Sequence, residues 1–340
     1  MTDKTAALAA LQNFGYTERQ ATFLHTVALH SGYFLRRQYL AFAGSDLGGT
    51  AQRLIDRLTE NRHLRTLRFS DRMTVYQLYA RPFYSAIGAE DNRNRRCHQP
   101  FAVRAKLMTL DFVLRHPDAE FFPTEQDRIE LFSERMGLPI AVLPTKVYCS
   151  KGRGNRTVRY FVDKNPVFLP AAPEGGARTV GFAYIQAASD TTAGLRTYLE
   201  QYRRLLKAVP AFRLVFVTTD SKLIPAAKKA FSKMVGCGVP SQGPDRETQR
   251  LLEHFDARIC HEHRDYSGFD TAGLQRLSRE LREFSGARFD WLFTLYKAGG
   301  RARVLAEIAP GSGAEESAKA SFEACILEHS YKFVGDGWAA

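Results

Sequence analysis

The chain has 340 residues, and its 44% hydrophobic and 12% aromatic content excludes a largely disordered protein and is enough for two folded domains. The net charge of +12 and the pI near 9.5 favour a polyanionic partner. No apolar run is long enough to span a membrane, and the first residues lack a signal-peptide pattern. The five scattered cysteines indicate reduced thiols, so we expect a cytoplasmic protein with no membrane partner.

The positive charge is concentrated toward the N-terminus. Residues 1–116 carry 17 basic and 9 acidic side chains, a net charge of +8. The remaining residues carry 31 basic and 27 acidic side chains, a net charge of +4. We therefore expect the surface that binds a polyanion to lie in the N-terminal third.

Two helices are predicted near the N-terminus. Thr17 and Gln20 have the spacing of a capping box, in which each side chain accepts a hydrogen bond from the other residue's backbone N–H. An apolar face at helical spacing follows, and Ser31-Gly32 ends the helix. A second, short helix is expected at about residues 35–42, with two arginines at its start.

A third helix and a hairpin complete the pattern. Residues 44–49 are expected to form a turn, and Thr50 to cap the third helix. Two runs of alternating hydrophobicity, residues 63–69 and 73–79, predict a β-hairpin with its turn at residues 70–72. Three helices followed by a two-stranded wing are typical of a winged helix-turn-helix, in which the third helix enters the major groove of DNA.

Arginine dominates the charge of this region. Residues 36–72 hold eight arginines against four acidic residues. The guanidinium group can bind both phosphate oxygens and the guanine edge, so we expect this region to bind double-stranded DNA. Winged helices also bind proteins, which leaves a non-catalytic scaffold as an alternative. The predicted DNA-binding residues are Arg36, Arg37, Gln52, Arg53, Arg57, Arg65, Arg68 and Arg72.

A connector separates this unit from the rest of the chain. The polar, arginine-rich residues 89–98 are interpreted as a solvated linker, with a path along the DNA backbone as the alternative. Apolar residues at helical spacing over 99–115 predict a connecting helix. The predicted domains are a winged helix-turn-helix at 1–80, a linker and connecting helix at 81–116, and an α/β domain with a helical C-terminal third at 117–340.

From Ala119 the pattern becomes α/β, so we expect a mixed protein that is α+β overall. A strand at 179–187, a helix at 191–209 and a strand at 212–218 predict a crossover with parallel strand pairing. The other expected elements are a strand at 120–122, a helix from Thr124 to Met136, a hairpin at 146–150 and 157–162, an edge strand at 165–169, and helices at 222–235, 247–259 and 271–284.

The order of these elements is similar to that of a restriction-endonuclease core. Such a core needs an Asp on one strand and an acid-x-Lys on the next. Asp118 or Glu120 offers the first acid, but Gln186 and Ala188 stand where the second acid and the lysine are needed. Because an amide lacks the charge that holds a divalent cation, we expect no catalytic residue, no metal and no other cofactor. A metal-dependent nuclease with its acids displaced to Asp118, Glu120 and Asp163 is the alternative.

Two further clusters have weaker patterns. Cys260, His261 and His263, with His254 upstream, are interpreted as an exposed group at a helix end, and a zinc site is the alternative. A basic hairpin tip is interpreted as a solvated turn, with a second contact to the DNA backbone as the alternative. The side chains of that tip are Lys151, Arg153, Arg156 and Arg159.

The chain resembles a known family over roughly residues 15–235. After the winged helix come Pro-Asp-Ala-Glu-Phe (117–121), the strand at 179–187, Tyr198-Leu199-x-x-Tyr202 and Val-Phe-Val-Thr (215–218). This order is similar to that of the replication-relaxation proteins of plasmids and integrative elements. The resemblance implies a degenerate nuclease-like domain, a role in mobile-element replication, mobilisation or transcription, and a relaxase or replication initiator as partner. Gln186 departs from the acidic residues that the family keeps in the central strand.

The C-terminal helices suggest an oligomer. The amphipathic helices within residues 244–297 exceed what a compact α/β core needs. Many helix-turn-helix proteins dimerise to bind two half-sites on DNA. We therefore expect these helices to form a homodimer.

Overall fold

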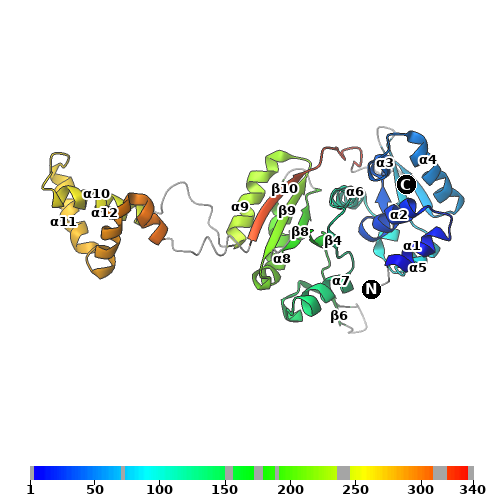
Figure 1. Cartoon of the computed structure of the whole chain (residues 1–340), viewed down its shortest axis with the longest axis horizontal. Coiled ribbons are helices and arrows are strands. Elements are labelled where there is room, and N and C mark those ends of the chain that lie inside the picture. The colour runs from blue at the N-terminus through cyan, green and yellow to red at the C-terminus, as the bar shows by residue number, and fades with distance from the viewer. Residues whose placement is uncertain are drawn as a thin grey trace. The chain divides into compact units, whose positions relative to one another are not determined.

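The computed structural model has the mixed helix and strand content that the sequence predicts, and its contacts divide the chain into two compact units (Figure 1). Unit 1 comprises Met1–Phe231 and Ala320–Ala340, and unit 2 comprises Ser232–Lys319. Unit 2 is therefore an insertion that begins in the last turn of helix Ile224–Val235 and ends before the last strand of unit 1. The structure describes residues 4–69, 73–149, 156–171, 179–187, 191–235, 246–308 and 320–335.

The N-terminal part of unit 1 has the order of helices and strands that the sequence predicts, and residues 18–78 are called the winged helix below. Its three strands pair antiparallel in the order β1-β3-β2. An additional helix, α1 (Lys4–Gln12), precedes the predicted elements. Those elements are α2 (Glu18–His30), β1 (Tyr33–Phe34), α3 (Arg36–Ala43), α4 (Gly48–Glu60), β2 (Leu64–Arg68) and β3 (Thr74–Leu78).

The predicted start and end of α2 are confirmed. The N–H of Gln20 donates to the Thr17 hydroxyl at 3.3 Å, and the N–H of Thr17 donates to the Gln20 side chain at 3.0 Å. Gly32 follows the helix with a φ of 77°, and a Cβ at this position would lie 2.3 Å from the Asn94 carbonyl oxygen. Glycine is therefore required here both for its conformation and for its size.

The predicted cap of α4 is wrong. The helix begins at Gly48 with Leu47 at the N-cap position. The N–H of Thr50 donates to the Leu47 carbonyl oxygen at 2.9 Å, so Thr50 already lies within the first turn. Its hydroxyl lies 3.4 Å from that of Ser45.

The segment predicted as a connector is more ordered than expected. It contains a short helix, α5 (Arg81–Ala86), and a single 3-10 turn, η2 (Arg93–Arg95), before the connecting helix α6 (Pro100–Leu114). The buried Asn94 donates its amide hydrogens to the carbonyls of Ala28 and Leu29 at 2.9 and 2.8 Å. The connector thus covers the C-terminal end of α2.

The small β-sheet of the winged helix contributes side chains to two cores. Leu78 packs into a core with helices α1–α4, where Phe23 contacts Phe34 with ring centroids 5.5 Å apart. Leu67 and Val75 pack into a second core with α6. Because α6 belongs to this second core, the winged helix is packed onto the rest of unit 1 through α6.

A five-stranded sheet forms the other half of unit 1. The predicted parallel pair β8 and β9 is confirmed, and their crossover is α8 (Ala193–Ala208). Beside β9 lies a parallel strand, β10, that the sequence did not predict. It follows unit 2 in the sequence but belongs to unit 1. The strand order is β10 (Ala320–Ile326), β9 (Phe212–Thr218), β8 (Val180–Ile185), β7 (Val167–Leu169), β4 (Glu120–Phe121).

Alternating side chains place this sheet between two helical layers (Figure 1). Phe182 and Tyr184 of β8 contact tyrosines of α8, with ring centroids 6.0 and 5.3 Å apart. Phe231 of α9 (Ile224–Val235) contacts Phe212 on the same face of the sheet. Ala183 points to the opposite face, in the core shared with α6. Helix α6 therefore lies between the sheet and the N-terminal helices.

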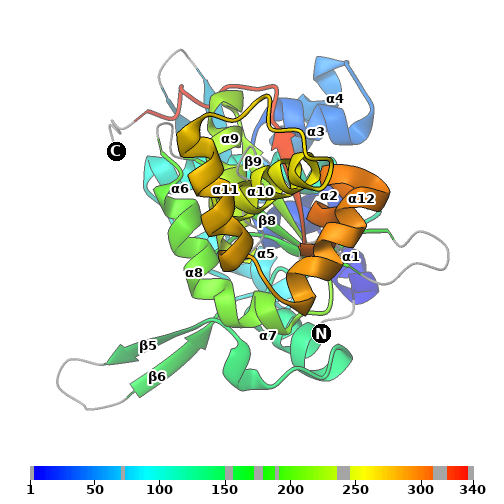
Figure 2. The ribbon, with the colours of Figure 1, turned by 90° about the vertical axis from the view of Figure 1, so that its left-hand side faces the viewer.

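The remaining elements of unit 1 follow β4. The capping box of Thr124 and Asp127 begins α7 (Glu125–Ile129), which continues as a π-helix over Glu130–Arg135. A 3-10 turn, η4 (Ile140–Val142), leads to the predicted hairpin. The hairpin consists of β5 (Thr145–Cys149) and β6 (Arg156–Tyr160), and it projects from the body of the unit (Figure 2).

Unit 2 is helical, as predicted for this region. It consists of α10 (Arg246–Glu262), α11 (Thr271–Glu283) and α12 (Ala287–Ile308). Its own core contains Phe255 and Phe293, whose ring centroids lie 5.3 Å apart. Across the described ranges of both units, every helix is too short or too polar to cross a membrane.

Helix α6 holds a buried lysine against the end of α2. Lys106 is 7% exposed, and its Nζ donates to the Ser31 carbonyl at 3.0 Å and to the Asn94 side-chain oxygen at 2.5 Å. Both partners are uncharged. Burial lowers the pKa of Lys106 from 10.5 to about 7.

This lysine should make stability depend on pH. Between the folded pKa and the higher unfolded pKa, the unfolded chain binds more protons, so stability rises with pH. The free energy of unfolding of the wild type, relative to that of Lys106→Met, should rise by about 1.4 kcal/mol between about pH 8 and about pH 9. Urea denaturation at both pH values measures this difference. A difference that does not change with pH would contradict the buried, titrating lysine.

Candidate nucleic-acid interface

Helix α4 presents a polar face to solvent. Its apolar residues point into the core, where Leu54 and Leu58 are fully buried. Gln52, Arg53 and Arg57 are exposed, as the helical spacing predicts. The Gln52 amide donates to the Asp56 carboxylate one turn away at 2.7 Å, which orients both side chains.

The predicted arginines around α4 differ in what they contact. Arg57 donates to the carbonyl of Gly15, and Arg36 donates to the carbonyl of Gly48 at 2.5 Å. These two exposed side chains therefore also tie neighbouring turns to the helix. Arg53 makes no hydrogen bond or ion pair with any residue that the structure describes, so its donors are open to a ligand.

The wing has one covered side. Leu67 packs against α6, and the Phe69 ring lies 6.5 Å from that of Phe333 in the segment after β10. Arg65 lies over the Tyr79 ring at 5.0 Å, and Arg68 is exposed. The wing thus keeps two exposed arginines in β2. The predicted contact Arg72 lies outside the described residues.

Arg37 has an ion-pair partner within unit 1. Its guanidinium binds both oxygens of Asp111 on α6, at 3.0 and 2.7 Å. The Tyr331 hydroxyl also binds this carboxylate, and Gln38 donates to it at 2.8 Å. Asp111 is 8% exposed, and a buried carboxylate requires a cation. Arg37 is partly exposed, but this ion pair joins α3 to α6, and we do not include it in the DNA interface.

The three acids of the alternative nuclease site have separate surroundings. Arg135 binds both oxygens of Glu120, at 2.7 and 3.1 Å. The Tyr202 hydroxyl donates to Asp163 at 2.5 Å, and Asp118 is exposed. The buried Gln186 donates to the Thr191 carbonyl at 2.9 Å. The described part of the chain holds no group of three His, Cys, Asp or Glu side chains placed to bind a metal.

The histidines of α10 lie in different environments. His254 is fully buried in unit 2, where burial lowers its pKa to about 4. His261 and His263 are exposed at the end of the helix, and His261 shares a hydrogen bond of 2.9 Å with the Tyr266 hydroxyl. Cys260 is partly exposed beside them. The buried His254 therefore lies in a different environment from the exposed His261 and His263.

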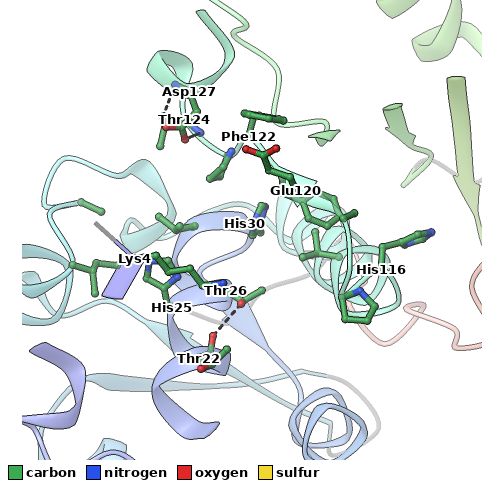
Figure 3. A pocket seen from close by; sticks show the side chains of 18 of the residues that line it. Lys4, Thr22, His25, Thr26, His30, His116, Glu120, Phe122, Thr124 and Asp127 are labelled. Carbon is green, nitrogen blue, oxygen red and sulfur yellow. Dashed lines mark hydrogen bonds between the residues drawn. The ribbon is translucent and has the colours of Figure 1, made fainter. Parts of the chain in front are cut away.

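A cleft of about 510 Å³ lies where the N-terminal helices meet β4 and α7 (Figure 3). Figure 3 shows His25 and His30 of α2 on one side and Glu120 on the other. Burial lowers the pKa of His25 to about 4 and that of His30 to about 3, so both are neutral at pH 7. The cleft has the volume and mixed lining of small-molecule sites. Sequence reasoning missed it because its walls come from distant segments.

Residues 18–78 form three helices and an antiparallel three-stranded sheet, and α4 has an exposed polar face. Comparisons with protein-family models, curated proteins and solved structures gave no match to this chain. The function proposed below therefore depends on the geometry and charge of this surface.

Proposed function

We propose that this protein binds double-stranded DNA, with α4 in the major groove and the wing on the adjacent backbone. The observation that supports this most directly is the exposed face of α4, on which Gln52 and Arg53 point to solvent. A major groove admits an α-helix, and the side chains of Gln and Arg can each form paired hydrogen bonds with base edges.

The charge of the surface supports the same proposal. Arg36, Arg53, Arg57, Arg65 and Arg68 are all exposed on α3, α4 and β2. Cations at these positions would bind phosphates and release counterions, which makes the affinity depend strongly on salt. We further propose an accessory or regulatory role in mobile-element replication, mobilisation or transcription, in the cytoplasm and without nuclease activity.

DNA binding is tested on duplexes selected from a random library with the wild-type protein. Arg53→Ala should cost about 1–3 kcal/mol of binding free energy if Arg53 contacts a base. The triple variant Arg53→Ala/Arg65→Ala/Arg68→Ala should also reduce the slope of log K against log salt by about 2 to 3, since each lost phosphate contact accounts for about 0.9. Fluorescence anisotropy at several salt concentrations measures both effects.

Arg203→Ala is the matched control, because Arg203 is an exposed arginine of α8 in unit 1. It should bind DNA as the wild type does. Equal affinity and equal salt slope in the triple variant and the wild type would exclude α4 and the wing as the interface. Light scattering on the same complexes counts the chains per duplex and so tests the proposed homodimer. Adding a relaxase or a replication initiator tests the proposed protein partner.

A further inference from the structure

The hairpin β5–β6 is a two-stranded ribbon with exposed apolar side chains on both faces. Val147 pairs directly with Val158, and Tyr148 pairs with Thr157, so the valines and the tyrosine lie on opposite faces. Val147, Tyr148 and Val158 are 42%, 40% and 46% exposed. An isolated two-stranded ribbon is only marginally stable in water, so a partner that covers these side chains would stabilise it.

The ribbon is also strongly basic. Its strands, residues 145–149 and 156–160, carry three basic residues (Lys146, Arg156 and Arg159) and no acidic one. Lys146 and Arg159 are paired across the strands on the same face as Tyr148, and the Lys146 ammonium lies 5.5 Å from the centre of the Tyr148 ring. The Glu125 carboxylate lies 3.5 Å from Arg159. One face therefore combines two cations with an aromatic ring.

The base of the ribbon is firmly attached to unit 1. The N–H of Tyr160 donates to Glu125 at 2.8 Å, and the N–H of Phe161 donates to the Pro144 carbonyl at 3.0 Å. The Phe161 ring stacks on Phe132, with centroids 5.6 Å apart. The strands therefore leave the body from a fixed base and project outward (Figure 2).

We propose that this hairpin is a second DNA-binding element, which inserts into the major groove of duplex DNA. The inference rests on the proposed function, because it assigns a second contact to the same ligand. The major groove of B-DNA admits a two-stranded ribbon, whereas a minor groove about 6 Å wide must first be widened to take one. Lys146 and Arg159 bind phosphates on the groove wall. Tyr148, on the same face as these cations, contacts the methyl groups of thymine, and the two valines on the opposite face contact sugars.

The test compares a variant that loses two positive charges on the hairpin with a control variant that loses two positive charges on α9. In Lys146→Gln/Arg159→Gln, the salt slope of binding to a duplex of about 40 base pairs should fall by about 1.8, and the affinity should fall on the order of tenfold. Tyr148→Thr/Val158→Thr retains residues that favour strands and should weaken binding with little change in salt slope. Lys228→Gln/Lys229→Gln removes two exposed lysines of α9 and should bind as the wild type does.

The outcomes separate this inference from the proposed function. If the hairpin variants bind as the wild type does while the Arg53/Arg65/Arg68 variant does not, the hairpin proposal is overturned and the proposed function stands. If only the hairpin variants lose affinity for DNA, the hairpin proposal is supported and the proposed role of α4 in DNA binding is overturned. A wild type that does not bind DNA overturns both. Binding to phosphatidylserine vesicles that only the hairpin variants lose, with DNA binding unchanged, identifies a membrane contact and also overturns the inference.

Discussion

Asp111→Ala should lower the free energy of unfolding by about 3–5 kcal/mol, because it removes one partner of a buried ion pair. The carboxylate accepts hydrogen bonds from Arg37, Gln38 and Tyr331, and its removal leaves these donors without their acceptor. Urea denaturation followed by circular dichroism measures the change. Asp118→Ala is the control, since Asp118 is exposed, and it should change stability by no more than about 0.5 kcal/mol.

This carboxylate also joins three parts of unit 1. Arg37 belongs to α3 of the winged helix, Asp111 to α6, and Tyr331 to the segment after β10. Loss of the carboxylate should therefore loosen the attachment of the winged helix to the sheet. A loss of stability below about 1 kcal/mol would mean that the surrounding packing holds the parts together without the ion pair.

Phe182→Ala should destabilise unit 1 by about 3–5 kcal/mol, the cost of removing a buried aromatic ring and leaving a cavity. Phe182 is fully buried on the central strand β8, and its ring lies within 5.9 to 6.1 Å of the rings of Phe132, Tyr202 and Phe212. These neighbours come from separate elements, so they cannot easily close the cavity. Thermal and urea denaturation measure the effect.

The control for this cavity is Phe101→Ala. Phe101 lies on α6 and is 55% exposed, so its removal should cost far less than that of Phe182. If the two variants were equally stable, the neighbours of Phe182 would have collapsed into the space, and the expected cavity would be absent.

Patterns within a short stretch of sequence were sufficient for much of the fold. The capping box of Thr17 and Gln20 marks the start of α2, because its two hydrogen bonds form within one turn. The alternation over residues 64–78 predicts the wing, because it sets which side chains face the core. The strand-helix-strand pattern at 180–218 predicts parallel pairing, because a helix between two strands carries the chain back to the end at which the first strand began.

Part of the candidate interface follows from the sequence in the same way. Gln52 and Arg53 are exposed because the buried positions of α4 recur at helical spacing, which leaves these residues on the opposite face. The basic character of the hairpin β5–β6 is likewise evident from its composition. That both of its faces are exposed depends on what the rest of the chain covers, and this requires the structure.

The sequence by itself thus determined most of the helices and strands of unit 1 and the exposure of the predicted arginines on α4 and β2. The tertiary structure decided which distant segments meet. Strand β10 pairs with β9 although about a hundred residues separate them, and Arg37 pairs with Asp111 across 74 residues. The cleft likewise joins α2 to β4. Such partners leave no periodic signal in the sequence, because each pairing depends on how whole elements pack together.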